Sequence, residues 1–191
     1  PQSSQAHLPW RGRITLSVAP GVEGSPDGTA SADAQVHAFF GTVTAEDFEI
    51  GETVSYSGPA DEWSLSRFIL HYAALCASAG GVDAFCIGSE LRGLTQIRGA
   101  GDQFVFVQSL RALAAQVRAI LGPDTKISYA ADWTEYSGYQ PQDGSGDRYF
   151  HLDPLWADEN IDFIGIDNYM PLSDWRDVTT HADAAWGSIY A

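Results

Sequence analysis

Residues 82–94 read VDAFCIGSELRGL. The segment from Val82 to Ile87 is short and almost continuously apolar, which is typical of a parallel strand covered on both faces. Gly88 then lets the backbone turn, and Glu90 follows just beyond the carboxyl end of the strand. Ligands bind at that edge of parallel α/β folds, because variable loops leave it while the strands stay rigid. The stretch therefore predicts a central strand and a candidate functional carboxylate.

Strands and helices alternate outward from this stretch. We expect strands at 13–18, 126–131 and 161–167, helices at 31–40, 65–79, 104–121 and from 174 onward, and a helical turn at 154–157. Residues 41–62 are polar and turn-rich, and are expected to form a surface excursion with a small hairpin. The helix capped by Ser64 is expected to bury one apolar stripe, made of Leu65, Phe68, Ile69, Tyr72 and Cys76. This order favours parallel strands with right-handed crossovers, the α/β class.

Composition excludes several classes of partner. The chain has 10 Lys and Arg against 25 Asp and Glu, a net charge of -15, which argues against nucleic acid or an anionic membrane surface. Its apolar runs fall short of the roughly 20 residues that span a bilayer, so no membrane span is predicted. The N-terminus has neither a signal peptide nor a Met, and we interpret residues 1–191 as one domain cut from a longer chain.

Cysteine and histidine usage predicts neither a metal nor another cofactor. Cys76 and Cys86 lie in apolar segments without a CxxC pattern, and are expected to be reduced core residues. His151 and Asp153 are placed to share a side of a strand, but two ligands do not make a site.

Polar and aromatic side chains follow three consecutive predicted strands. They are Ser89 and Glu90, then Asp132, Trp133 and Glu135, then Asp167, Asn168 and Tyr169. The carboxyl ends of parallel strands share one rim, so we expect these residues to form a site there. Asp132 and Asp167 are equally explained as caps of the segments that follow, and Trp133 and Tyr169 as ordinary wall residues.

Two of these segments resemble motifs of the retaining TIM-barrel glycoside hydrolases. FCIGSEL at 85–91 resembles the fourth-strand motif of that clan, and DFIGIDNYMPL at 162–172 resembles the sixth. Residues 126–133 fit the fifth strand and 13–18 the third, which implies part of a (β/α)8 barrel, roughly strands three to six with their helices. The resemblance implies that Glu90 is the general acid/base, with the nucleophile on a seventh strand outside this chain. Ser89 stands where these hydrolases usually carry Asn.

A closer resemblance covers nearly the whole chain. Segments 9–14, 55–59, 87–93, 127–133 and 167–176 resemble the TIM-barrel-like domain of tail-tip host-specificity proteins in gene transfer agents and related tailed phages of alphaproteobacteria. The resemblance implies a tail-tip location on a phage-like particle, other tail-tip or baseplate proteins as partners, and a cell-envelope glycan as substrate. Trp133 and Tyr169 would stack on sugar rings, and neighbouring polar residues would bind hydroxyls: Ser89, Asp132, Glu135, Asp167 and Asn168.

Three functions remain open from the sequence. The domain is a retaining glycoside hydrolase, a glycan-binding barrel that has lost its chemistry, or a structural barrel of a tail-tip assembly. A different catalytic pair, Glu90 with Glu135 or Asp132, would suit an inverting enzyme if the carboxyl groups lie roughly 6.5–9.5 Å apart.

Overall fold

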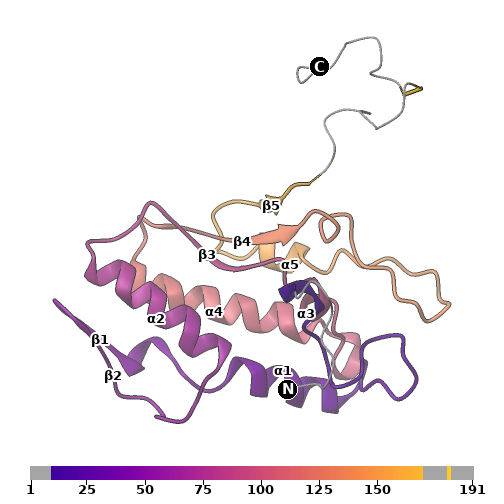
Figure 1. Cartoon of the computed structure of the whole chain (residues 1–191), viewed down its shortest axis with the longest axis horizontal. Helices are drawn as coiled ribbons and strands as arrows, with labels where there is room; N and C mark the ends of the chain where they lie inside the picture. The colour runs from indigo at the N-terminus through magenta and orange to yellow at the C-terminus, as the bar shows by residue number, and fades with distance from the viewer. Residues whose placement is uncertain (1–9, 170–179, 182–191) are drawn as a thin grey trace.

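The computed structural model describes residues 10–169 and 180–181. Figure 1 shows a small sheet lying over a layer of two long helices, α2 (Leu65–Ser78) and α4 (Val105–Leu121). Beneath these helices lie α1 (Ala30–Phe40) and a hairpin of β1 (Phe48–Ile50) and β2 (Val54–Tyr56). The hairpin predicted within 41–62 is thereby confirmed, since the two strands pair antiparallel.

The sheet has the parallel order that the sequence predicts. Its strands are β3 (Ala84–Ser89), β4 (Lys126–Asp132) and β5 (Gly165–Asp167), hydrogen-bonded in the order β3-β4-β5. Ala130 lies opposite Gly165, where a Cβ would come within 2.7 Å of the Tyr129 carbonyl oxygen. The mixed α/β class is confirmed, and the sheet is consistent with part of a TIM barrel.

Helix ends follow their local signals. The Ser64 side chain accepts a hydrogen bond from the Arg67 amide at the start of α2, as its capping role predicts. Gly122, with a φ of 78°, ends α4. The predicted turn near residue 155 is α5 (Asp153–Trp156), and a short helix that the sequence did not predict, α3 (Arg92–Thr95), follows Glu90.

The buried face of α2 differs from the predicted stripe. Phe68 and Tyr72 are 58% and 51% exposed, whereas Ala73 and Ala74 are fully buried. The alanines allow α2 and α4 to approach closely, and the larger rings are left on the opposite side. The core between helices and sheet is made of apolar side chains from every layer, including Val36, Leu70, Ile87, Phe106, Leu110, Val117, Ile127 and Tyr129.

The strand predicted at residues 13–18 is absent from the structure. Residues Arg11–Arg13 form a 3-10 turn, and the backbone after it lies against α3, where a Cβ on Gly93 would be 2.6 Å from the Ile14 carbonyl oxygen. The cysteines are free, as predicted, but Cys86 is exposed rather than in the core. It lies on the face of the sheet that the helices do not cover. The helix expected from residue 174 falls outside the described residues, apart from 180–181.

None of the helices in the described part of the chain is long and apolar enough to cross a bilayer.

Candidate functional site at the carboxyl ends of the strands

The backbone at Glu90 has an uncommon conformation. The pairing of β3 with β4 is irregular between Cys86 and Ser89, which places Ser89 opposite Ala130. Glu90 follows with a φ of 52°, and its amide donates to the Ala130 carbonyl oxygen at 2.8 Å. Residues other than glycine rarely adopt this left-handed region, at a cost of about 1 kcal/mol. The surrounding contacts therefore hold Glu90 against a local backbone preference.

One oxygen of the Glu90 carboxylate is held by the N-terminal segment. Oε2 accepts a hydrogen bond from the Trp10 indole Nε1 at 2.8 Å and lies 3.1 Å from Nη2 of Arg11. Oε1 accepts no hydrogen bond from any described residue, and the whole residue is only 6% exposed. The carboxylate is therefore fixed through one oxygen, while the other is available for a further partner.

Arg11 also connects Glu90, which follows β3, to β5 at the opposite edge of the sheet. Its Nε donates to the Ser89 carbonyl oxygen at 2.6 Å, and its Nη2 donates to Ser89 Oγ at 2.7 Å. Ser89 Oγ in turn donates to Oδ2 of Asp167 at 2.7 Å, across β4. The sequence expectation that Ser89, Glu90 and Asp167 share one rim agrees with these contacts.

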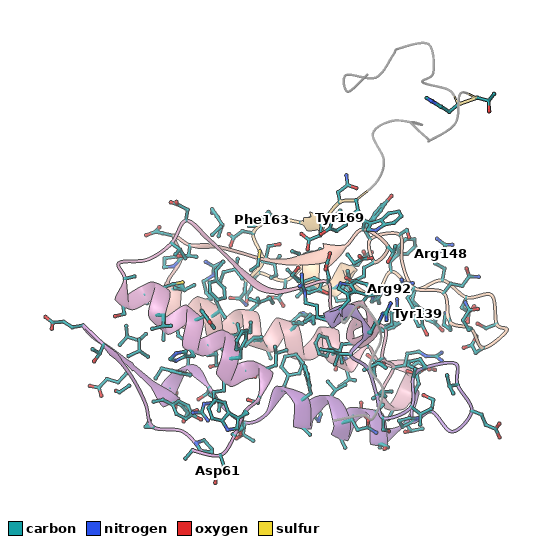
Figure 2. The ribbon with its side chains drawn as sticks, viewed as in Figure 1. Asp61, Arg92, Tyr139, Arg148, Phe163 and Tyr169 are labelled. Atoms are coloured by element: carbon teal, nitrogen blue, oxygen red, sulfur yellow. The ribbon has the colours of Figure 1, made fainter. Side chains whose placement is uncertain are left out.

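The remaining rim residues differ in exposure. Asp132 is buried, and its Oδ1 accepts from the amide and the hydroxyl of Thr134, so it caps the turn after β4. Trp133 and Asn168 are exposed, as is Tyr169, which is labelled beside β5 in Figure 2. The aromatic rings at these strand ends are thus accessible to a ligand.

Glu135 lies in the core rather than on the rim. It is 1% exposed and accepts hydrogen bonds from Thr95 Oγ1 at 2.6 Å and from the Asp132 amide at 2.7 Å, and Tyr129 Oη donates to it at 3.2 Å. Burial raises the pKa of Glu135. Glu135 is thus held inside the protein by its neighbours, and its roles as substrate ligand or catalytic partner stay predictions.

Tyr129 links this buried carboxylate to the Glu90 turn. Its hydroxyl accepts from the Leu91 amide at 2.7 Å while it donates to Glu135. Burial holds the pKa of Tyr129 well above its ordinary value, so the hydroxyl stays a donor. Glu135 therefore positions the backbone directly after Glu90.

Sequence reasoning missed Trp10 and Arg11 as members of the site. They lie 80 and 78 positions from the residues they bind. Their only signal was their place in a segment that carries the family resemblance. No group of three or more His, Cys, Asp or Glu side chains in the described residues is arranged to hold a metal ion.

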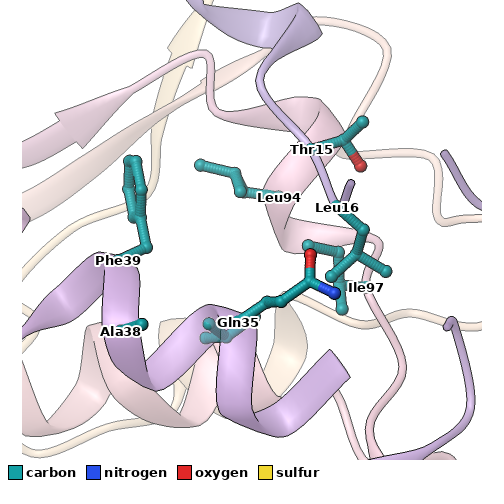
Figure 3. Close-up of a pocket in the computed structure, with 8 residues that line it drawn as sticks. Thr15, Leu16, Gln35, Ala38, Phe39, Leu94 and Ile97 are labelled. Carbon is teal, nitrogen blue, oxygen red and sulfur yellow. The ribbon is translucent and has the colours of Figure 1, made fainter. Parts of the chain in front are cut away.

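Two cavities flank the N-terminal segment. A cleft of about 400 Å³ lies beside Trp10 and α3, with Arg13, Arg92 and Tyr139 in its wall. An apolar cavity of about 340 Å³ lies between α1 and the backbone at Thr15 and Leu16 (Figure 3). Thr15 lines both cavities and so lies between the cleft beside Trp10 and the cavity beside α1.

Comparison with protein families agrees with this architecture. A family model described as the GTA TIM-barrel-like domain matches residues 63–191. The chain belongs to the GTA TIM-barrel-like domain family. The match in this GTA domain includes all three strands of the parallel sheet and Glu90. A search of curated proteins finds no match.

Proposed function

We propose that this GTA domain is a glycoside-hydrolase-like barrel at the tail tip of a phage-like particle, where it acts on a cell-envelope glycan. Residues 1–191 would supply part of the barrel, with β3, β4 and β5 as its strands four to six, and other tail-tip or baseplate proteins would be its partners. The observation that carries the proposal is Glu90, a nearly buried carboxylate at the carboxyl end of β3, whose Oε1 accepts no hydrogen bond from the residues that the structure describes. Its left-handed backbone supports the same reading, because strained residues cluster at functional sites.

The chemistry would be hydrolysis with retention. Glu90 would protonate the leaving oxygen through Oε1 and then deprotonate the incoming water. The nucleophile would be a second carboxylate about 5 Å away, the separation that a covalent glycosyl intermediate requires. Trp133 and Tyr169 would stack on the sugar, and Asp167 and Asn168 would bind its hydroxyls.

One observation favours a second candidate, a glycan-binding or structural barrel without activity. Arg11 forms an ion pair with Glu90 and also binds both the carbonyl and the hydroxyl of Ser89. A carboxylate held in this way is a fixed hydrogen-bond acceptor, which suits binding or assembly as well as proton transfer.

Hydrolysis by the complete protein separates these candidates. Reducing ends released from purified peptidoglycan and from surface polysaccharide would be measured for wild type, Glu90→Gln and Glu52→Gln. Glu52 is an exposed residue in the hairpin turn, so its variant is the matched control. We expect Glu90→Gln to lower the rate by about a hundredfold or more, the usual contribution of an acid/base, and Glu52→Gln to leave it unchanged.

Three other results of this assay would contradict the proposed hydrolase function. Release that is equal in wild type and Glu90→Gln would remove Glu90 from the chemistry. Binding without release by any variant would favour the glycan-binding barrel, and neither binding nor release would favour the structural one.

A further inference from the structure

The cleft beside Trp10 is basic, although the protein is acidic. Arg13 and Arg92 line it together with Gln96, Tyr139 and Gln142, and none of the described residues in its wall is acidic. Figure 2 shows Arg92 and Tyr139 next to each other near α3. In a chain with 25 acidic residues against 10 Lys and Arg, such a surface is unexpected by composition alone.

The two arginines of the cleft have no side-chain partner within residues 10–169. Neither Arg13 nor Arg92 forms an ion pair or a side-chain hydrogen bond with any residue that the structure describes. Five other basic side chains pair with carboxylates, namely Arg11, Arg98, Arg111, Arg118 and Lys126, whereas Arg67 and Arg148 donate to backbone carbonyl groups. Among the described residues, the guanidinium groups of Arg13 and Arg92 are therefore available to an anion.

Two carboxylates beside Tyr139 are held by another arginine. Asp27 and Asp143 influence Tyr139, and both bind Arg98, at 2.9 Å and 3.2 Å respectively. Arg98 offsets only part of their negative charge, so the positive charge of the cleft itself comes from Arg13 and Arg92. A second unused group is Thr15, whose buried Oγ1 has no hydrogen-bond partner in the described part of the chain.

The cleft and the Glu90 site share a wall. Trp10 lines the cleft, and its indole Nε1 binds Glu90. A Cβ on Gly12 would lie 2.4 Å from the Trp10 ring, so the indole packs directly on the backbone there. A volume of about 400 Å³ falls within the roughly 300–1,000 Å³ of small-ligand sites. A glycan that is held at Glu90 and passes Trp10 would reach the cleft.

We propose that this cleft binds an anionic substituent, a carboxylate or a phosphate, on a sugar next to the one held at Glu90. Guanidinium groups match both anions in charge and in geometry. Gln96, Gln142 and the Tyr139 hydroxyl supply neutral hydrogen bonds for the sugar itself, and Trp10 supplies an apolar face. The inference rests on the proposed function and narrows its substrate class to acidic glycans.

Calorimetric titration of the complete protein tests the inference. All variants would carry Glu90→Gln so that no probe is cleaved. The probes are a tetrasaccharide of alternating glucuronic acid and N-acetylglucosamine, a phosphorylated mannose oligosaccharide, and neutral chitotetraose. Arg13→Gln and Arg92→Gln would be compared with Arg148→Gln, which changes the net charge equally but lies outside the cleft.

We expect at least one acidic probe to bind more tightly than chitotetraose, and the stronger acidic probe identifies carboxylate or phosphate as the preferred anion. Arg13→Gln and Arg92→Gln should each weaken acidic binding about tenfold, the size of one charge-assisted hydrogen bond, while Arg148→Gln should not. Two results would overturn the inference without contradicting the proposed action on a glycan. One is equal affinity for acidic and neutral probes, and the other is unchanged affinity for the acidic probes in both arginine variants. Absence of binding to every probe by a folded protein would overturn the inference, and only the hydrolysis assay would then decide the proposed function.

Discussion

His151 is a residue at which burial opposes ionisation. It is 2% exposed, lies among the rings of Phe104 and Tyr139, and its Nε2 has no hydrogen-bond partner among the described residues. Burial lowers its pKa from 6.5 to about 4, although Asp153 and the Tyr149 carbonyl oppose the shift. The sequence placed His151 near Asp153 as an insufficient metal pair, and the structure gives it a packing role instead.

The pKa of His151 predicts acid sensitivity. An unfolded chain takes up a proton near pH 6.5, whereas the folded chain does so only near pH 4, so stability is full above pH 6.5 and falls as the pH drops toward 4. The loss from this group is about 3 kcal/mol. Urea unfolding at pH 7.5, 5 and 4 should show a smaller pH dependence for His151→Phe than for wild type.

The control for this measurement is the exposed His37 in α1. His37→Gln should keep the wild-type pH dependence. If His151→Phe and wild type lose stability in parallel, the loss belongs to the carboxylates, and the prediction for His151 is wrong.

At the scale of elements, α3 depends on its contact with the N-terminal segment. A Cβ on Gly93 would be 2.6 Å from the Ile14 carbonyl oxygen and 2.8 Å from that of Gly12. These atoms are backbone and have little room to move. The contact fixes the distance between α3 and the segment that carries Trp10 and Arg11, and through them the position of Glu90.

Gly93→Ala should therefore destabilise the protein by about 2 kcal/mol, the usual size of overpacking. Chemical denaturation would measure the change in the free energy of unfolding. Gly51→Ala is the matched control, because a Cβ there has its nearest neighbour at 3.8 Å. Equal stability of the two variants would mean that the N-terminal segment is free to shift away from α3.

The elements that the sequence predicted correctly are those with local signals. β3 and β4 are apolar runs, and α2 and α4 have a capping serine or a terminal glycine. Residues 13–18 alternate like a strand, but this pattern does not reveal whether a neighbour pairs with it, and here the segment lies against α3. Glu135 was misplaced for a similar reason, since its partner Thr95 is 40 positions away.

At the scale of the molecule, the sheet is covered on one face only within the described part. α2 and α4 lie against one side, and the exposed residues of the other side include Ala84 and Cys86 on β3. In a closed barrel this second face points inward. If residues 1–191 form part of a closed barrel, the thiol of Cys86 should therefore be shielded from solvent inside it.

In the complete protein, Cys86 should react with iodoacetamide as slowly as the partly buried Cys76, although it is exposed among the residues described here. Alkylation followed by mass spectrometry would give the rate for each thiol, and Cys86→Ala would confirm the assignment. A denatured sample gives the unprotected rate. Rapid labelling of Cys86 in the native complete protein would contradict a closed barrel.

The left-handed backbone at Glu90 affects which residues evolution can accept at position 90. Glycine or asparagine at position 90 would relieve the backbone strain at a φ of 52° while deleting the acid. Local backbone preference and chemistry thus act in opposite directions at a single codon. A lineage that no longer uses the carboxylate should exchange it readily for glycine or asparagine, whereas a lineage that still depends on it should keep glutamate despite the strain.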